Sequence, residues 1–413
     1  MNPFRPISIS LSPNTEKEDI SLALKMMFSP SLWKEGKEIE VLEEEFKKYL
    51  GVSNAFSFNS GRSALLSILS SLHIKEGDEV LVQAFTCNAA VNPILWKGLN
   101  PVYVDINDSF NMDVRDLERK ITDKSRAVMV QHTFGLPADL DEIKDICKKH
   151  NLFLIEDCAH SLGATYKGRK VGTFGDAAFF SFSRDKIISS VYGGMAITNS
   201  ISIAMRIEDF KRNIDFPRSC WIFQQLLHPV LMNYVILPTY LFLGKYLLIL
   251  FQTFRILSKA VHFREKRGLK PSYFPKKLPN ALAILALEQM KKIKKFENHR
   301  KELASYYMRE LQGTEFKFVP EYKDREETFL RFTVRHESAH KIIKEAWKRN
   351  LLIGDWYTSV IAPDDTKLDR MKYVSGSCPN AERLSKETIN LPTHINISKE
   401  EAEKITEFLE NIR

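Results

Sequence analysis

Several residue groupings that mark particular classes of protein are missing from this sequence. Its five cysteines are scattered along 413 residues and form neither a CxxC pair nor a Cys/His group at metal-ligand spacing. We therefore expect a reducing compartment, no disulfide framework and no metal site. No nucleic-acid-binding motif is recognisable, so we expect no nucleic-acid partner. The first 14 residues lack an apolar run, which predicts a cytoplasmic protein without a secretory signal.

Charge is missing from one long stretch. From Trp221 to Gly244 there is no Asp, Glu, Lys or Arg, and the run YLLILFQTF after Lys245 is also uncharged. A spanning helix needs ~20 apolar residues, but polar residues and prolines interrupt the first half of this stretch. These interruptions are Gln224, Gln225, His228, Pro229, Asn233 and Pro238.

Two interpretations of this stretch stand side by side. In the first, it forms a shallow helical hairpin at an anionic membrane face, and the basic run FREKRGLK at 263–270 lies near the lipid headgroups. The contact would extend over residues 221–270, and the protein would be peripheral at the inner face of the membrane. In the second, the apolar side chains pack on the body of the protein or in a dimer interface.

The composition is otherwise that of a soluble globular protein, with 44% apolar and 27% charged residues. A chain of 413 residues is long enough for two domains. The net charge of +8 favours anionic ligands or an anionic surface but says nothing about the fold.

Periodicity and turn residues predict the main elements. Helices are expected at 18–27, 35–49, 139–150, 278–311, 339–348 and 399–411. Strands are expected at 55–58, 80–82, 102–104, 126–131, 152–155, 177–182, 195–198 and 329–334.

Residues 152–198 carry the strongest chemical signal. Two apolar runs in this block are followed by Asp157 and by Lys186. If both runs are strands of an α/β sheet, these side chains meet at its carboxyl edge, where such folds bind ligands. Pyridoxal 5'-phosphate requires this pair: a lysine holds it as a Schiff base, and a carboxylate keeps its pyridine nitrogen protonated. We assign Lys186 and Asp157 to these roles; the alternative is a solvated surface lysine and a strand-end cap.

A second signal lies in the run AFSFNSGRSALL. A short strand at 55–58 meets a turn, and a helix begins near Ser63. Free N–H groups at the positive end of a helix form a phosphate cradle, made here by Ser60, Gly61, Arg62 and Ser63. The alternative is an ordinary capped helix with Ser60 or Ser63 as its N-cap.

The stretch IEDCAHSLGATYKGRKVGTFGDAAFFSFSRDK resembles the active-site block of the DegT-type sugar aminotransferases. These are pyridoxal-phosphate enzymes of the aspartate aminotransferase superfamily, fold type I. The resemblance extends from about residue 33 to 200, resumes at about 278 and does not cover 216–275. It implies an α/β fold with a mostly parallel central sheet, helices on both faces, and a smaller C-terminal α+β domain.

The domain organisation that follows has three parts. Residues 1–215 form a large cofactor-binding domain, 216–275 an apolar and basic insert, and 276–413 an interface helix with the small domain.

The resemblance also implies roles for single residues. His160, placed on the helical turn after Asp157, would lie beside the cofactor ring, and Ser181 would contact the phosphate. The family has an aromatic residue that stacks on the ring at the position of Cys87. A thiol is too small to cover a ring face, so Asn88 or another side chain would take that place. Arg62 stands where the family has threonine and would either bring its charge to the phosphate or point away.

The implied function is transfer of an amino group, from glutamate, to a nucleotide-linked keto sugar by a homodimer in polysaccharide or glycan precursor synthesis. A pyridoxal-phosphate-dependent sugar dehydratase is one alternative. The family's dehydratases replace the catalytic lysine, usually by histidine, so Lys186 argues against it. A catalytically inactive, membrane-attached scaffold of the same fold is the other alternative.

Overall fold

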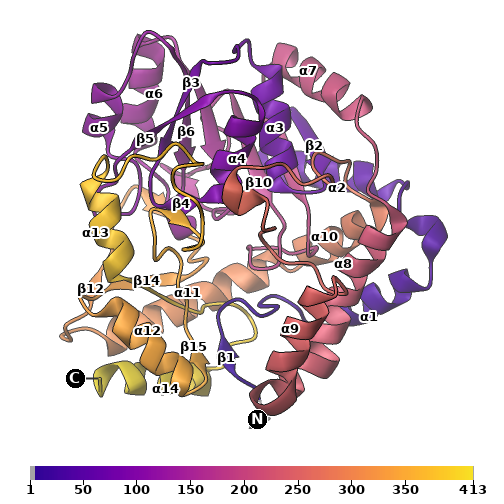
Figure 1. Ribbon diagram of the computed structural model, residues 1–413, viewed down its shortest axis with the longest axis vertical. Helices are drawn as coiled ribbons and strands as arrows, with labels where there is room; N and C mark the ends of the chain where they lie inside the picture. The colour runs from indigo at the N-terminus through magenta and orange to yellow at the C-terminus, as the bar shows by residue number, and fades with distance from the viewer. Residues whose placement is uncertain (1–4, 413) are drawn as a thin grey trace.

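A seven-stranded sheet forms the centre of the molecule (Figure 1). The computed structural model describes residues 5–412. The order of strands is β2-β11-β10-β7-β6-β3-β5; β11 is antiparallel to both its neighbours, and all other adjacent pairs are parallel. Their bounds are β2 Asn54–Phe58, β3 Glu79–Gln83, β5 Asn100–Val104, β6 Ser125–Gln131, β7 Phe153–Asp157, β10 Ala177–Ser181 and β11 Gly194–Thr198. The prediction of a mostly parallel sheet is confirmed.

Helices cover both faces of this sheet because strand side chains alternate between two buried clusters. Phe180 packs with α2 and α6, whereas its neighbour Phe179 packs with α3 and α4 on the opposite face. The helices of the first layer are α2 Glu38–Leu50, α5 Val114–Arg119, α6 Leu140–Lys149 and α10 Asn280–Met290. Those of the second are α3 Gly61–Ser71, α4 Asn88–Trp96, α7 Ile201–Arg212 and α13 Pro379–Glu387.

A smaller α+β unit follows, with its own buried cluster. Its three-stranded antiparallel sheet has the order β12-β14-β17. The elements are α11 Ile293–Glu310, β12 Lys317–Phe318, β14 Phe332–Arg335, α12 Ala339–Lys348, β17 Thr388–Leu391 and α14 Lys399–Glu410. The strand predicted at 329–334 begins later than expected, because Phe329 has a φ of 46° and lies outside the extended region.

The helix predicted over 278–311 is two helices. α10 ends at Met290 and α11 begins at Ile293. Leu282 of α10 is buried in the core of the large domain, whereas Leu303 of α11 is buried in the core of the small one. The break lets the chain pass from one core to the other.

Short elements complete the fold and pair distant segments. They are β1 Ile7–Ser8 with β15 Leu351–Leu352, β4 Thr86–Cys87 with β16 Ile361–Ala362, and β13 Arg325–Glu326 with β8 Thr165–Tyr166 and β9 Arg169–Lys170. The remaining helical pieces are α1 Lys17–Met27 and the 3-10 turns η1 Pro30–Leu32, η2 Thr133–Gly135 and η6 Glu265–Arg267.

The apolar insert forms a helical hairpin, the shape that the membrane interpretation predicts. It comprises α8 Ser219–Leu231, η3 Met232–Ile236, η4 Leu237–Thr239, η5 Tyr240–Gly244 and α9 Lys245–Thr253. The helical stretch Ser219–Thr253 is long and apolar enough to cross a membrane by length and composition, and 17% of its most apolar 18-residue window is buried. However, the chain doubles back, because the Gln224 side chain donates to the carbonyl of Arg255 and α9 contacts η3. A Cβ on Gly244 would lie 2.0 Å from the Ile236 oxygen, so the close approach at the turn requires glycine.

Candidate active site

The carboxyl ends of the parallel strands open into a cavity of about 100 Å³. Asp157 is the last residue of β7, and Ser181 is the last residue of the adjacent strand β10. The cavity is also lined by other residues that the sequence analysis selects: Gly61, Arg62, Cys87, His160 and Lys186. Ser60 and Ser63 lie beside it as part of the α3 N-terminus. The structure thus brings all nine predicted site residues into one region.

Asp157 is a buried carboxylate facing this cavity. Its Oδ1 accepts a hydrogen bond from the N–H of Ala159 at 3.0 Å. Burial raises the pKa of Asp157 to about 6, because desolvation disfavours the charged form. A cationic group placed in the cavity would stabilise the carboxylate, so this side chain fits the protonated nitrogen of a pyridine ring.

Lys186 enters the cavity from the loop after β10. Its Nζ lies 4.6 Å from the centroid of the Trp356 ring. Burial lowers the pKa of Lys186, although the neighbouring Asp185 acts in the opposite direction. A larger fraction of the free amine at neutral pH suits a nucleophile or a base.

His160 is buried between aromatic rings rather than on a helix. The helical turn predicted after Asp157 is wrong: residues 158–164 form irregular turns, because the Asp157 carboxylate binds the N–H two residues on and redirects the chain. His160 stacks on Phe134 and Trp356, with ring centroids 5.9 and 5.6 Å away. Burial holds the pKa of His160 well below its usual value, so its imidazole is neutral.

The N-terminus of α3 forms the other end of the cavity. The first intrahelical hydrogen bond runs from the N–H of Ala64 to the oxygen of Ser60, so the N–H groups of Gly61 and Arg62 precede it. Ser60 caps the helix by accepting from the N–H of Ser63 at 3.1 Å. The turn is therefore a capped helix, and its leading residues Gly61 and Arg62 line the cavity; their role as a phosphate cradle stays a prediction.

The side chain of Arg62 points away from the cradle. Its Nε lies 2.5 Å from Oε1 of Glu265, which is fully buried, and its Nη2 donates to the carbonyl of Ala260 at 2.9 Å. Burial lowers the pKa of Arg62, but the Glu265 charge and the neighbouring Tyr192, Cys87 and Tyr273 together raise it above its usual value. Arg62 therefore holds the segment that returns from the hairpin over the cavity.

Neither Cys87 nor Asn88 provides an aromatic face. Burial raises the pKa of the Cys87 thiol, which keeps it neutral. Asn88 is fully buried and donates to Thr366 at 3.2 Å, so it is not a replacement stacking group.

Sequence reasoning missed the residues from the C-terminal third of the chain that close the cavity. Trp356 and Tyr357 line it, and the Tyr357 hydroxyl lies 3.3 Å from Nε2 of His160. Arg331 lies 3.5 Å above the Trp356 ring and 3.7 Å from Oδ2 of Asp185. The adjacent Trp-Tyr pair in the polar loop at 354–360 could have indicated these residues from the sequence.

A buried polar cluster braces the strand that carries Asp157. Glu156 accepts hydrogen bonds of 2.7 Å from the N–H groups of Gly172, Phe174 and Gly175, and its Oε2 lies 3.2 Å from His132. Ligand-type atoms of His132, Glu156 and Cys158 lie within 4.8 Å of one another. Because the Glu156 carboxylate already binds four donors, we interpret the cluster as structural.

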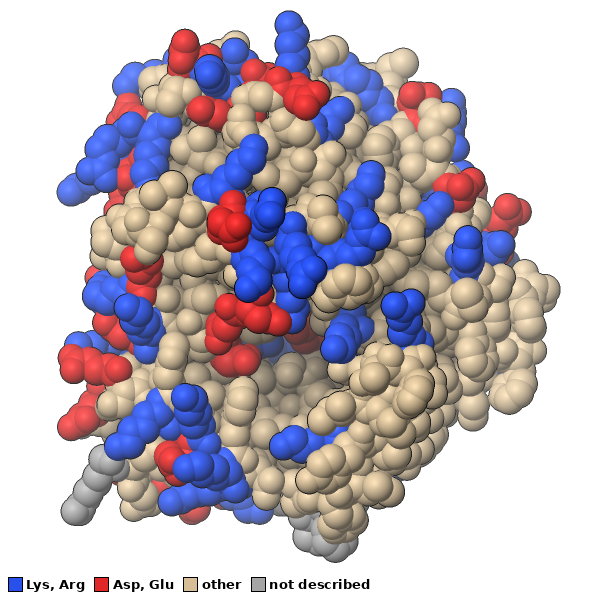
Figure 2. All heavy atoms as spheres, in the orientation of Figure 1, with Lys and Arg blue, Asp and Glu red and all other residues tan. Residues whose placement is uncertain are grey.

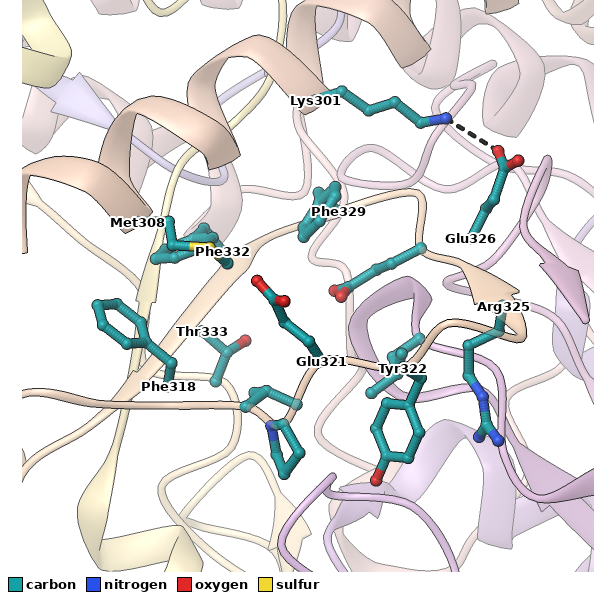
Figure 3. Close-up of a pocket in the computed structure, with 14 residues that line it drawn as sticks. Lys301, Met308, Phe318, Glu321, Tyr322, Arg325, Glu326, Phe329, Phe332 and Thr333 are labelled. Carbon is teal, nitrogen blue, oxygen red and sulfur yellow. Dashed lines mark hydrogen bonds and ion pairs between the residues drawn. The ribbon is translucent and has the colours of Figure 1, made fainter. Parts of the chain in front are cut away.

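Three larger cavities lie beside or away from this site, and one of them, of about 480 Å³, is lined by Leu11, Tyr240 and Tyr246 among others. A vestibule of about 580 Å³ leads to Trp356 and Tyr357, and the hairpin residues Leu248 and Gln252 form part of its opposite wall. A separate cavity of about 310 Å³ lies against α11 and β14 (Figure 3). It contains none of the predicted site residues, and its Lys301 and Glu326 are paired at 3.0 Å.

The chain is similar to known proteins over most of its length and not only at this site. Residues 14–215 and 254–410 match the profile of the DegT/DnrJ/EryC1/StrS aminotransferase family. The match resumes 24 residues before the point expected from the sequence (278 − 254), so the internal stretch outside it is 216–253, which contains the hairpin.

The chain is similar to GDP-perosamine synthase of Escherichia coli O157:H7, with 41% identity over 48% of this chain and 53% of that protein. It spans about half the length of this and the next two curated relatives. It is 31% identical to the lipopolysaccharide biosynthesis protein RfbH of Salmonella typhimurium over 76% of this chain and 70% of that protein. The aminotransferase PseC of Helicobacter pylori has the same fold, with a TM-score of 0.76, 23% identity and 98% of both chains covered.

Proposed function

The chain belongs to the DegT/DnrJ/EryC1/StrS aminotransferase family, and from this membership we propose that it is a pyridoxal-phosphate-dependent aminotransferase. Its acceptor is a nucleotide-linked keto sugar, its donor is glutamate, and its product enters polysaccharide synthesis. The observation that carries the proposal is the convergence of Asp157, Lys186 and the α3 N-terminus on one cavity.

The donor groups of this cavity match the parts of the cofactor. The leading N–H groups of α3 and the Ser181 hydroxyl would hold the phosphate, and Asp157 would bind the ring nitrogen. When bound, the cofactor supplies an electron-withdrawing ring that stabilises negative charge at the substrate carbon.

The remaining chemistry belongs to side chains of the protein. The Lys186 Nζ would hold the cofactor covalently and, once released from it, would act as the base that removes a proton from the substrate and as the acid that returns it. Its lowered pKa favours the free amine that proton removal requires. Trp356 and the neutral His160 cover the cavity and exclude water.

The names of the relatives support the substrate class. Both GDP-perosamine synthase and a UDP-N-acetyl-3-dehydro-alpha-D-glucosamine 3-aminotransferase of Acidithiobacillus ferrooxidans are named for nucleotide sugars. We further propose that the enzyme is a homodimer, that it is cytoplasmic, and that residues 221–270 hold it at the inner face of the membrane.

The test is a half-reaction on purified protein. After reconstitution with pyridoxal phosphate, the near-visible absorbance of the bound cofactor should change when glutamate is added. It should recover when a keto sugar nucleotide is supplied from a panel. Protein that binds no cofactor would support the scaffold alternative, and release of water from the sugar without amination would support a dehydratase.

A further inference from the structure

We propose that the α8–α9 hairpin docks this protein on the surface of an anionic lipid bilayer, with the outward face of α9 inserted at the level of the headgroups. This names the docking face and the lipid chemistry for the peripheral location proposed above, and it rests on that proposal.

The outward face of α9 is apolar. No residue of α9 is buried, and Tyr246, Ile249, Leu250 and Phe254 are 67, 55, 47 and 69% exposed. Their spacing places them on one side of a helix. The inward side is apolar too, since Leu248 and Phe251 pack against the cluster around Met232. A helix on a water-exposed surface carries polar residues on its outer face, so α9 is built for an apolar surrounding.

Exposed apolar side chains are concentrated in this segment. Among the described residues, 19 large hydrophobic side chains are exposed, and 11 of them lie between 216 and 275. They are Phe223, Tyr234, Phe242, Leu243, Tyr246, Ile249, Leu250, Phe254, Ile256, Phe263 and Leu269. Soluble monomers scatter such side chains singly, whereas a cluster marks an interaction surface.

The charge of the same segment identifies the partner. Residues 216–275 contain eight basic residues: Arg218, Lys245, Arg255, Lys259, Arg264, Lys266, Arg267 and Lys270. They contain one acidic residue, Glu265, which is buried against Arg62. The segment thus has a net charge of 8 − 1 = +7, and the whole chain has +8. One of the eight, Lys266, is paired with Asp365 outside the segment. Figure 2 shows the surface over α8 and α9 as largely uncharged, with basic side chains gathered above it.

This combination fits a bilayer surface better than a protein. Each basic side chain near an anionic membrane contributes attraction, while apolar side chains enter the boundary between headgroups and acyl chains. A protein partner would have to match both the apolar face and the surrounding cationic region.

The hairpin lies in the interface and does not cross it. The arm from 240 to 253 has 14 residues, a length of about 21 Å at 1.5 Å per residue, which is less than the ~30 Å hydrocarbon core. The other arm is fixed to the protein, because Ile222 and Leu226 of α8 are fully buried in the main core. Because Leu248 and Gln252 line the vestibule, docking also brings the mouth of the active site within about 10 Å, one helix diameter, of the lipid.

Flotation with vesicles tests the proposal on cofactor-loaded full-length protein. Wild type should float with phosphatidylcholine vesicles containing phosphatidylglycerol, and both removal of the anionic lipid and high salt should reduce binding roughly tenfold. Ile249→Glu/Leu250→Glu should reduce it by a similar factor, roughly tenfold. The matched control is Ile201→Glu/Met205→Glu on α7, whose side chains are 76 and 67% exposed, and it should float like wild type.

A second variant distinguishes loss of lipid binding from misfolding. Arg264→Glu/Lys270→Glu leaves the apolar face intact and should also reduce flotation. Wild type that stays unbound at low salt would overturn the proposal. The proposal would also be overturned if wild type does not bind vesicles and Ile249→Glu/Leu250→Glu converts a dimer into a monomer. A second copy of the chain would then cover the outward face of α9. The glutamate half-reaction on the same samples reports separately on the proposed aminotransferase.

Discussion

The block at 152–198 and the α8–α9 hairpin differ in what they bury and what they expose. In the block at 152–198, buried polar side chains are held by neighbouring groups: the Glu156 carboxylate binds four donors, and His160 lies between two aromatic rings. In the hairpin, apolar side chains are exposed and α9 has no buried residue. The block therefore buries its polar groups, whereas the hairpin leaves apolar side chains exposed, which is the feature on which the proposed lipid contact rests.

The largest effect should come from the one reactive group of the block. Lys186→Ala removes the proposed attachment point and proton carrier, so turnover should fall by ~10²–10⁴-fold, while the fold persists. Turnover is measured by amino transfer from glutamate to a keto sugar nucleotide. Borohydride reduction followed by mass mapping should place the cofactor on Lys186 in wild type, and labelling of another lysine would contradict the assignment.

The ion pair between Arg62 and Glu265 joins the two regions and offers the next test. Glu265→Ala leaves a buried guanidinium without its counter-charge, which should destabilise the protein by about 3–5 kcal/mol in chemical denaturation. The double variant Arg62→Met/Glu265→Met should lose much less, because no charge remains unpaired. Equal losses in the two variants would mean that packing, not charge, holds the returning segment.

The sequence was sufficient to place Asp157 and Lys186 near one another, because both follow strands of the same block. Strand periodicity located β7 and β10, and parallel strands must bring Asp157 and the loop carrying Lys186 to the same sheet edge. The ring contacts of Trp356 and the partner of Arg62 come from segments far along the chain, and no periodicity encodes such pairings. The break between α10 and α11 was missed for the same reason, because the two helices pack into different hydrophobic cores.

Through Asp157, the stability of the apoprotein should depend on pH, and bound cofactor should reverse this dependence. The pKa of Asp157 is raised to about 6 by burial, so the folded apoprotein binds a proton that the unfolded chain, with a pKa of ~3.9, has released. Stability of the apoprotein should therefore fall as the pH rises from about 4 to 6. Asp157→Asn removes this loss and should stabilise the apoprotein at pH 8 by up to about 3 kcal/mol.

Thermal melts from pH 4 to 8, with and without cofactor, measure this effect. In the holoprotein the carboxylate has a cationic partner, so the same variant should lose affinity for the cofactor and most of its turnover. If the stability of the apoprotein does not change with pH in either wild type or Asp157→Asn, this result would contradict the burial of a titrating carboxylate.

The smallest effect should be the most informative about the hairpin. Deleting 221–257 would also remove Ile222 and Leu226, which are fully buried, so single substitutions separate the two faces better. Leu226→Ala on the inward face should cost about 2–5 kcal/mol of unfolding free energy in buffer. Leu250→Ser on the outward face removes a side chain that is 47% exposed and should change stability by no more than ~0.5 kcal/mol. If Leu250→Ser instead costs as much as Leu226→Ala at low protein concentration, α9 packs inside the protein in solution, and its outward face is not free to meet a bilayer.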